Sequence, residues 1–298
     1  MEHLYNWGID LGGTKIECAV LDRQDPTKVI HRERIDTESV KGYDHIMAQV
    51  GRLIDSVSEK LGFRPEQIGF ATPGVLDPTS QTMKNCNTTS MNGKPMAVDL
   101  ARVVGCEVRL ANDANCFALA EALLGAVQDV NPKAQIVFGI IMGTGVGGGL
   151  VVHGQVVNGF HGIGGEWGHN ILEDGGDPCY CGKSGCVEKV ISGPALELFY
   201  ERQTGQKRKL KEIVQAYQDH SDPAVDLVEA SAAAVSAPAQ AVSGVVVLEV
   251  VAEEVVEAEA KVADVVDAVA VVIMAAETEA GDARTVTNVW IDAGSDPA

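Results

Sequence analysis

Two stretches of this chain share one organisation, in which an apolar strand runs into a turn of glycine and threonine and a second strand leaves it. The residues from Tyr5 to Ile9 read as a buried strand, and Asp10 to Lys15 (DLGGTK) follow as the first turn. Gln135 to Met142 form a continuous apolar strand, and Gly143 to Gly149 (GTGVGGG) follow as the second turn. Two such hairpins in one chain are less expected by chance than one, and they indicate duplicated halves.

The tips of these hairpins have the chemistry of a phosphate site. Bare glycine amides and a threonine hydroxyl suit a polyphosphate, and the carboxylate of Asp10, at the end of its strand, could hold the accompanying magnesium ion. The candidates are Gly12, Gly13, Thr14 and Lys15 in the first tip and Gly143, Thr144 and Gly145 in the second. Taken alone, the DLGGT motif fits an ordinary Gly-Gly turn as well as it fits a phosphate-binding turn. No GK[ST] with the spacing of a Walker loop appears in the chain, and glycines between two paired strands do not fit a Rossmann motif.

A possible metal site lies in the glycine-rich segment that follows the second hairpin. His169, Cys179, Cys181 and Cys186 are spaced as H…C-x-C-x-x-x-x-C. Three thiolates and an imidazole are ligands that zinc prefers, and four protein ligands leave no open position, so the site would be structural. The alternatives are reduced buried thiols or a disulfide, which needs an oxidising compartment. The spacing favours zinc.

Acidic residues on either side of this metal site are candidates for substrate binding. The same ion would hold Glu166, His169 and Glu188 near one another, so that they could face a substrate. The alternative for each glutamate is a solvated surface residue.

Asp113 is the candidate for acid–base chemistry. A predicted strand from Glu107 to Ala111 runs into Asn112 and Asp113, and an apolar helical pattern follows. The carboxyl end of a strand, where a helix begins, is where open α/β sheets bind ligands. From this local pattern alone, capping of the helix by Asn112 or Asp113 is an equally good interpretation.

The remaining pattern predicts further elements of an α/β protein. Tyr43 to Val57 have helical spacing, and Ile68 to Ala71 read as a strand that ends at Thr72-Pro73-Gly74. Asn85 to Asn92 read as a polar loop. Ile191 to Thr204 read as a helix whose Leu196, Leu198 and Phe199 point inward.

The composition changes near Asp219, beyond which Ala, Val and Glu dominate. Val251 to Ile273 have apolar residues at helical spacing, which predicts one long amphipathic helix. The alternative is a tail without a single well-defined structure, because a core of Ala and Val side chains gives little shape complementarity. Val245 to Val250 could instead form a strand.

Length and charge limit the classes of function. At 298 residues, the chain is long enough for two domains that enclose a cleft. The formal net charge of −19 argues against nucleic acid and against an anionic membrane surface as partners. No apolar run is long enough to cross a bilayer and no leader precedes the first strand, so we expect a soluble, cytoplasmic protein.

Five motifs in this order, DLGGT, ANDAN, GTGVGGG, GEWGH and CYCGKSGCVE, resemble the ROK family of bacterial sugar kinases and sugar-responsive repressors, within the actin-like ATPase superfamily. The resemblance extends from about Tyr5 to about Gln215. It implies an α/β fold of two ribonuclease H-like domains, with residues 1–118 as the first and 119–298 as the second, which carries the zinc knuckle. Residues from about 219 to 298 would be an atypical part of the second domain. In the family, a strand followed by glycines contacts the adenosine, and this chain has no clear match to it. Asn288 to Gly294 resemble it only weakly.

The resemblance also implies roles for individual residues. Asp113 matches the general base that takes a proton from the sugar hydroxyl, and His169 matches a residue that both ligates zinc and faces the sugar. The other matches to the sugar pocket are Gly74, Asn92, Asn112, Glu166 and Glu188. The matches to the ATP phosphate loops are Asp10, Gly12, Gly13, Thr14, Gly143, Thr144 and Gly145. Family members commonly form homodimers, so a homodimer is expected here.

The resulting hypothesis is an ATP-dependent hexose kinase that uses ATP, Mg²⁺ and a structural Zn²⁺. Fructose or glucose is favoured over an N-acetylhexosamine as its substrate. Two alternatives have the same fold. One is a sugar-sensing regulator, and the other is a degenerate sugar-binding protein that has lost ATP binding.

Overall fold

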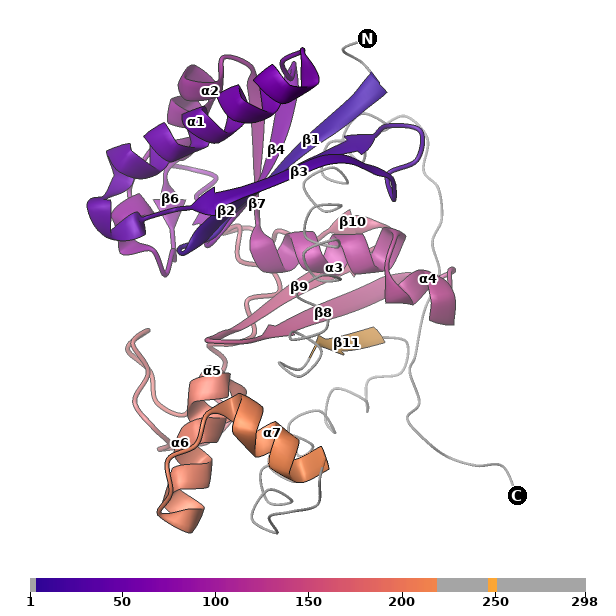
Figure 1. The fold of residues 1–298 in the computed structure, drawn as a ribbon. Coiled ribbons are helices and arrows are strands. Elements are labelled where there is room, and N and C mark those ends of the chain that lie inside the picture. The colour runs from indigo at the N-terminus through magenta and orange to yellow at the C-terminus, as the bar shows by residue number, and fades with distance from the viewer. Residues whose placement is uncertain (1–3, 219–245, 251–298) are drawn as a thin grey trace.

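The computed structural model describes residues 4–218 and 246–250, which form two larger β-sheets with helix α3 (Asp113–Leu123) between them (Figure 1), and a third sheet of two short strands. None of the helices in these ranges is long and apolar enough to cross a membrane. The helix predicted for Val251 to Ile273 and the stretch Asn288 to Gly294 lie outside the described residues.

The first sheet has the strand order β3-β2-β1-β4-β7. Its strands are β1 (Tyr5–Leu11), β2 (Lys15–Asp22), β3 (Val29–Asp36), β4 (Gln67–Thr72) and β7 (Glu107–Asn112). β1, β2 and β3 pair antiparallel, whereas β4 and β7 extend the sheet in parallel. The sequence analysis predicts β1, β2, β4 and β7, but β1 continues through Asp10 and Leu11, so Asp10 lies within the strand, opposite Glu17 of β2.

Two helices cover one face of this sheet, α1 (Tyr43–Leu61) and α2 (Met96–Val104). The apolar residues of α1 recur every three or four positions, so Ile46, Val50 and Leu53 fall on one face of the helix and are buried against Trp7 and Ile9 of β1. The connection from β4 to α2 carries the short strands β5 (Val75–Leu76) and β6 (Met83–Lys84) and the 3₁₀ helix η3 (Thr89–Met91); another, η2 (Ser39–Lys41), precedes α1.

The second sheet has the strand order β10-β9-β8-β11. Its strands are β8 (Ile136–Met142), β9 (Val146–Val152), β10 (Gln155–Val156) and β11 (Val246–Val250). β8 and β9 form the second predicted hairpin, and β11 pairs in parallel with β8, so the alternative of a strand near Val245 to Val250 is the one that the structure shows.

Helix α3 is buried from Ala114 to Ala122, because it has a sheet on either side. Its small side chains allow this close packing. A Cβ atom added to Gly139 of β8 would lie 2.7 Å from the Cβ of Ala118, and one added to Gly149 of β9 would lie 2.8 Å from it. Ala71 of β4 belongs to the same cluster of buried residues, so the helix also contacts the first sheet.

The other helices of the described chain are α4 (Ala126–Val130), α5 (Glu188–Ile191), α6 (Gly193–Thr204) and α7 (Leu210–Gln218), and the segment 157–187 before α5 consists of turns and loops. The inward position expected for Leu198 is wrong, since this side chain is 40% exposed. Leu196 and Tyr200, four residues apart, share the buried face of α6, and Leu198 lies on the opposite side. Phe199 packs at the edge of the same cluster.

Candidate functional site

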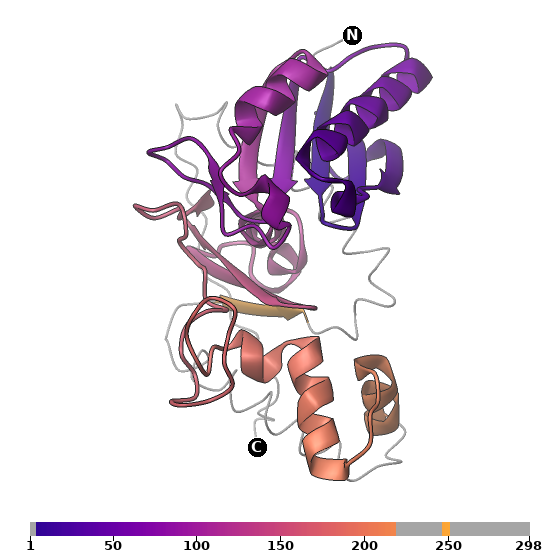
Figure 2. The same cartoon turned by 90° about the vertical axis from the view of Figure 1, so that its left-hand side faces the viewer.

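A cavity of about 300 Å³ lies where the carboxyl ends of β4 and β7 face the tip of the β8–β9 hairpin and the cysteine-rich segment. In Figure 2 the loops that follow β4 lie on the same side of the molecule as this segment. Nine residues predicted for the site line the cavity: Gly74, Asn112, Asp113, Gly143, Thr144, Gly145, Glu166, His169 and Glu188. The structure thus brings together residues from widely separated parts of the chain.

Asn112 and Asp113, which were equal candidates for the helix cap, have different roles in the structure. Asn112 is the N-cap of α3, where its Oδ1 accepts a hydrogen bond from the backbone N–H of Asn115 at 3.1 Å. Asp113 is therefore free to face the cavity. Its Oδ1 accepts hydrogen bonds from the backbone N–H of Ala114 at 2.8 Å and from Nδ2 of Asn112 at 3.0 Å, which orient the carboxylate.

The surroundings of Asp113 shift its pKa. Protein atoms crowd the carboxyl group although water can reach it through the cavity, and this desolvation raises the pKa of Asp113 to about 6. The hydrogen bonds from Ala114 and Asn112 act in the opposite direction. A carboxylate with a pKa near 6 is ionised at neutral pH and is a better base than an ordinary aspartate.

Asp10 lies close enough to Asp113 for the two charges to interact. Burial raises the pKa of Asp10 to about 7, with further contributions from the negative charges of Asp113 and Glu17, while Arg34 lowers it. Glu17 itself is buried and pairs with Arg34. This excess of negative charge favours a bound cation, because a divalent ion would relieve the repulsion.

The two glycine hairpins contribute unequally to the cavity. Gly143, Thr144 and Gly145 of the second tip line it, and Gly143 N–H donates to the carbonyl of Gly145 at 2.9 Å. Asp10 and the residues of the first tip, Gly12, Gly13, Thr14 and Lys15, are not among its lining residues. Lys15 pairs instead with Asp36.

Two glutamates give the cavity more acidic groups. Burial raises the pKa of Glu166, and the charges of Asp113 and Glu188 raise it further. Glu188 is 7% exposed, and its Oε2 accepts a hydrogen bond from the backbone N–H of Val146 at 3.2 Å. Several carboxylates and amides around one cavity suit a neutral polyhydroxy compound, since each can accept or donate to a hydroxyl group.

Asn92 lies outside the cavity lining. Its Oδ1 accepts from the backbone N–H of Cys86 at 2.9 Å and its Nδ2 donates to the Cys86 carbonyl at 3.0 Å, so it stabilises the loop that carries Asn85 and Asn87. These two asparagines do line the cavity. Sequence reasoning assigned this stretch only to a polar loop.

Tyr180 is a further lining residue that the sequence did not indicate for the site. Because Tyr180 lies between Cys179 and Cys181, the local sequence indicated only a metal-binding loop.

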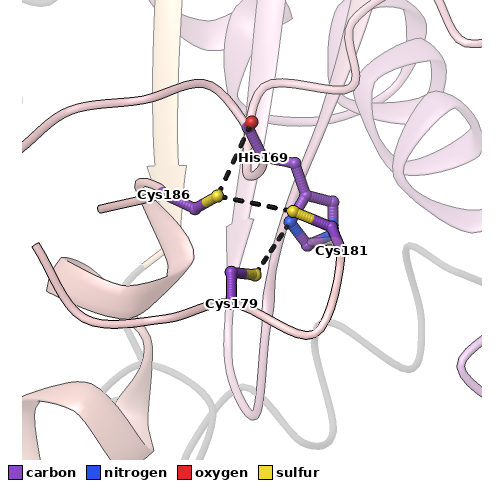
Figure 3. Close-up of side chains that lie close together, drawn as sticks. All are labelled: His169, Cys179, Cys181 and Cys186. Atoms are coloured by element: carbon purple, nitrogen blue, oxygen red, sulfur yellow. Dashed lines mark hydrogen bonds between the residues drawn. The ribbon is translucent and has the colours of Figure 1, made fainter. Parts of the chain in front are cut away.

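The predicted metal ligands lie together (Figure 3). One ligand atom each from His169, Cys179, Cys181 and Cys186 lies within 4.8 Å of all the others. The distance from Cys181 Sγ to Cys186 Sγ is 3.6 Å, and that from Cys179 Sγ to His169 Nδ1 is also 3.6 Å. Around a tetrahedral zinc ion with bonds of about 2.3 Å, sulfur ligands lie about 3.8 Å apart. The donor set and its spacing therefore fit zinc, and a disulfide, whose sulfurs lie about 2 Å apart, does not describe these cysteines.

The similarity of this sequence to known proteins agrees with the geometry of the site. The model of the ROK family matches residues 6–287. An N-acetyl-D-glucosamine kinase from Vibrio atlanticus (strain LGP32) is 36% identical over 233 residues, which cover 75% of this chain and 74% of that protein.

Solved structures show the same fold. The ROK hexokinase from Thermus thermophilus matches with a TM-score of 0.72 at 27% identity, over 92% of this chain and 99% of that chain. A ROK family transcriptional regulator, a homologue of the E. coli MLC protein, matches with a TM-score of 0.67 over 90% of this chain and 71% of that chain. Its identity of 22% indicates a shared fold alone. These likenesses confirm the predicted α/β, actin-like architecture.

Proposed function

We propose that this chain, which belongs to the ROK family, is a kinase that transfers the γ-phosphate of ATP to a hydroxyl group of a sugar. The observation that carries the proposal is the position of Asp113. Its carboxylate faces a cavity that is also lined by the polar groups of Asn112, Glu166 and Glu188 and by the glycine tip of the β8–β9 hairpin.

N-acetyl-D-glucosamine is the first candidate for the sugar. The V. atlanticus relative, which is named an N-acetyl-D-glucosamine kinase, shares 36% of its residues with this chain over most of both sequences. This favours an N-acetylhexosamine over the fructose or glucose that the motifs alone suggested. Asn85 and Asn87 add amide groups to the cavity, and amides can bind an acetamido group as well as a hydroxyl.

The chemistry follows from these positions. Asp113 accepts the proton of the attacking hydroxyl, and its raised pKa of about 6 makes it a stronger base while leaving it ionised at neutral pH. The backbone amides of Thr144 and Gly145 bind the phosphates, and Glu166, His169 and Glu188 orient the sugar. Phosphoryl transfer depends mainly on such positioning and on neutralisation of charge. Asp10 would hold the magnesium ion that accompanies ATP, which supplies positive charge beside the transferred group.

The cysteine cluster has a structural role in this proposal. Three cysteines and His169 would hold a zinc ion with no open coordination position, and the ion supplies rigidity to the segment between Glu166 and Glu188.

A panel of sugars tests the proposal. Purified protein with Mg²⁺ and ATP would be offered N-acetyl-D-glucosamine, N-acetyl-D-mannosamine, glucose and fructose, and ADP release would be followed in a coupled assay. We expect the highest kcat/KM with N-acetyl-D-glucosamine. Turnover with a different sugar would show that this sugar, and not N-acetyl-D-glucosamine, is the substrate. Sugar binding without any turnover would favour the sugar-binding alternative and overturn the kinase.

A further inference from the structure

Glu188 contacts both parts of the candidate site. It is the first residue of α5, and its side chain lines the cavity beside Glu166 and His169. Its Oε2 accepts the hydrogen bond from the backbone N–H of Val146, the residue that follows the glycine tip of the β8–β9 hairpin. Among the described residues, its Oε1 has no hydrogen-bond donor from the protein. One carboxylate thus lies against the hairpin tip and also faces the cavity.

The absence of a side chain at Gly145 is explained by this carboxylate. A Cβ atom added to Gly145 would lie 2.6 Å from Oε2 of Glu188. The φ angle of Gly145 is not in the left-handed region, so its backbone conformation is open to alanine. Gly143, two residues earlier, has nothing within 4 Å of an added Cβ atom. Of these two glycines, only Gly145 is required by a neighbouring side chain.

The backbone around α5 fixes Glu188 in this position. The N–H of Glu188 donates to the carbonyl of Gly168 at 2.9 Å, which attaches it to the segment that carries Glu166 and His169. The N–H of Gly193, just after α5, donates to the carbonyl of Gly143 at 2.8 Å. The hairpin tip is therefore anchored to both ends of this short helix.

We infer that Glu188 is a positioning residue that couples the two substrates: Oε2 fixes the hairpin tip assigned to the phosphates of ATP, while Oε1 remains available for a sugar hydroxyl. This inference rests on the proposed function and extends it. Because both ligands act on one carboxylate, each should change the affinity for the other by the same factor. A substitution in the phosphate hairpin should then alter sugar binding even when no nucleotide is present.

Gly145→Ala tests the link from the hairpin to the sugar. The added methyl group would displace the flexible end of Glu188 and leave the backbone in place. Isothermal titration with N-acetyl-D-glucosamine, without nucleotide, should show an affinity about tenfold weaker than that of the unmodified protein, as expected when a buried hydrogen-bonding group is displaced. The matched control is Gly143→Ala, for which we expect a sugar Kd within about twofold of the unmodified value, since its methyl group meets no neighbour.

Two substitutions of Glu188 test the link in the other direction. In the absence of sugar, Glu188→Ala should weaken the binding of Mg²⁺ and a non-hydrolysable ATP analogue about fivefold, because the N–H of Val146 loses its acceptor. Glu188→Gln should retain the analogue affinity, since its carboxamide oxygen can accept the same hydrogen bond. A residue that served the sugar alone would leave nucleotide affinity unchanged in both variants.

The outcomes separate this inference from the kinase proposal. Equal sugar affinities for Gly145→Ala and Gly143→Ala, or equal analogue affinities for the two Glu188 variants, would overturn the coupling while the kinase activity stands. An unmodified protein that neither binds nor phosphorylates any sugar in the panel would overturn the proposed function and the coupling with it. Melting temperatures would identify a variant that fails to fold; if Gly145→Ala does so, the Glu188 pair decides.

Discussion

Nε2 of His169 lies 3.1 Å from the hydroxyl oxygen of Tyr180, and both side chains line the cavity. The other nitrogen of the same ring, Nδ1, faces Cys179 in the cysteine cluster. A metal ion on Nδ1 leaves the proton on Nε2, which then donates to Tyr180. One imidazole therefore connects the cluster with the place where the sugar is expected to bind.

Loss of one cysteine of the cluster should lower both zinc content and stability. We expect Cys181→Ser to contain less than one zinc ion per chain by metal analysis and to lose several kcal/mol of unfolding free energy, because a structural zinc contributes on the order of 10 kcal/mol in small domains. Cys106→Ser, outside the cluster, is the control and should keep its zinc. A chelator should lower the Tm of the unmodified protein toward that of Cys181→Ser. An unchanged Tm in both tests would contradict the zinc assignment.

Removal of the Tyr180 hydroxyl should affect the sugar more than the chemistry. Tyr180→Phe loses the hydrogen bond to His169, so the imidazole is held less firmly, and we expect the KM for sugar to rise about three- to fivefold. The kcat should stay within about twofold, since the hydroxyl is not placed at the transferred proton. Tyr5→Phe, at a tyrosine of β1 whose ring stacks on Phe63, is the matched control. Equal KM values for the two variants would show that the hydroxyl plays no part.

Asp113→Asn should abolish turnover with little effect on sugar affinity. Asparagine keeps an oxygen that can accept from Ala114 but cannot take a proton, so kcat should fall by about 10³-fold or more, while the sugar Kd stays within about tenfold. Asp55→Asn, at an exposed ion pair with Arg64, is the control. Activity of Asp113→Asn near that of the control would rule out the assignment of Asp113 as base.

The activity should depend on pH through the same carboxylate. A base must be unprotonated, and the pKa of Asp113 is raised to about 6, so kcat/KM should be constant at higher pH and fall as the pH drops through about 6. Below that value the decrease approaches tenfold per pH unit, as for a single titrating group. The measurement is a profile of kcat/KM from pH 5 to 9. Activity that stays constant down to pH 5 would contradict the raised pKa.

Much of the fold follows from patterns that lie within single elements. The strands on either side of each glycine turn and the helix after Asp113 were predictable, because alternation and helical spacing are local properties of the sequence. Leu198 was misplaced because the prediction grouped neighbouring apolar residues and did not apply the helical spacing, which puts Leu198, two residues from Leu196, on the opposite face.

The site was less predictable, because it depends on contacts between distant residues. Local sequence could not separate the capping role of Asn112 from the exposed carboxylate of Asp113. The hydrogen bond between Glu188 and Val146 joins residues 42 positions apart, and no motif contains both. Asn92, which the resemblance assigns to the sugar pocket, forms both of its amide hydrogen bonds with the backbone of Cys86, a contact that no motif indicates.

The contacts of Ala118 with Gly139 and Gly149 have a consequence for the dimensions of the molecule. Asp113 is the first residue of helix α3, and the methyl group of Ala118 opposite the bare Cα atoms of Gly139 and Gly149 helps to set how closely this helix packs against β8 and β9. A larger residue at any of these three positions would act as a spacer and push the carboxylate away from the glycine tip of the hairpin. The reach of the reactive group is thus fixed by residues that never meet the substrate.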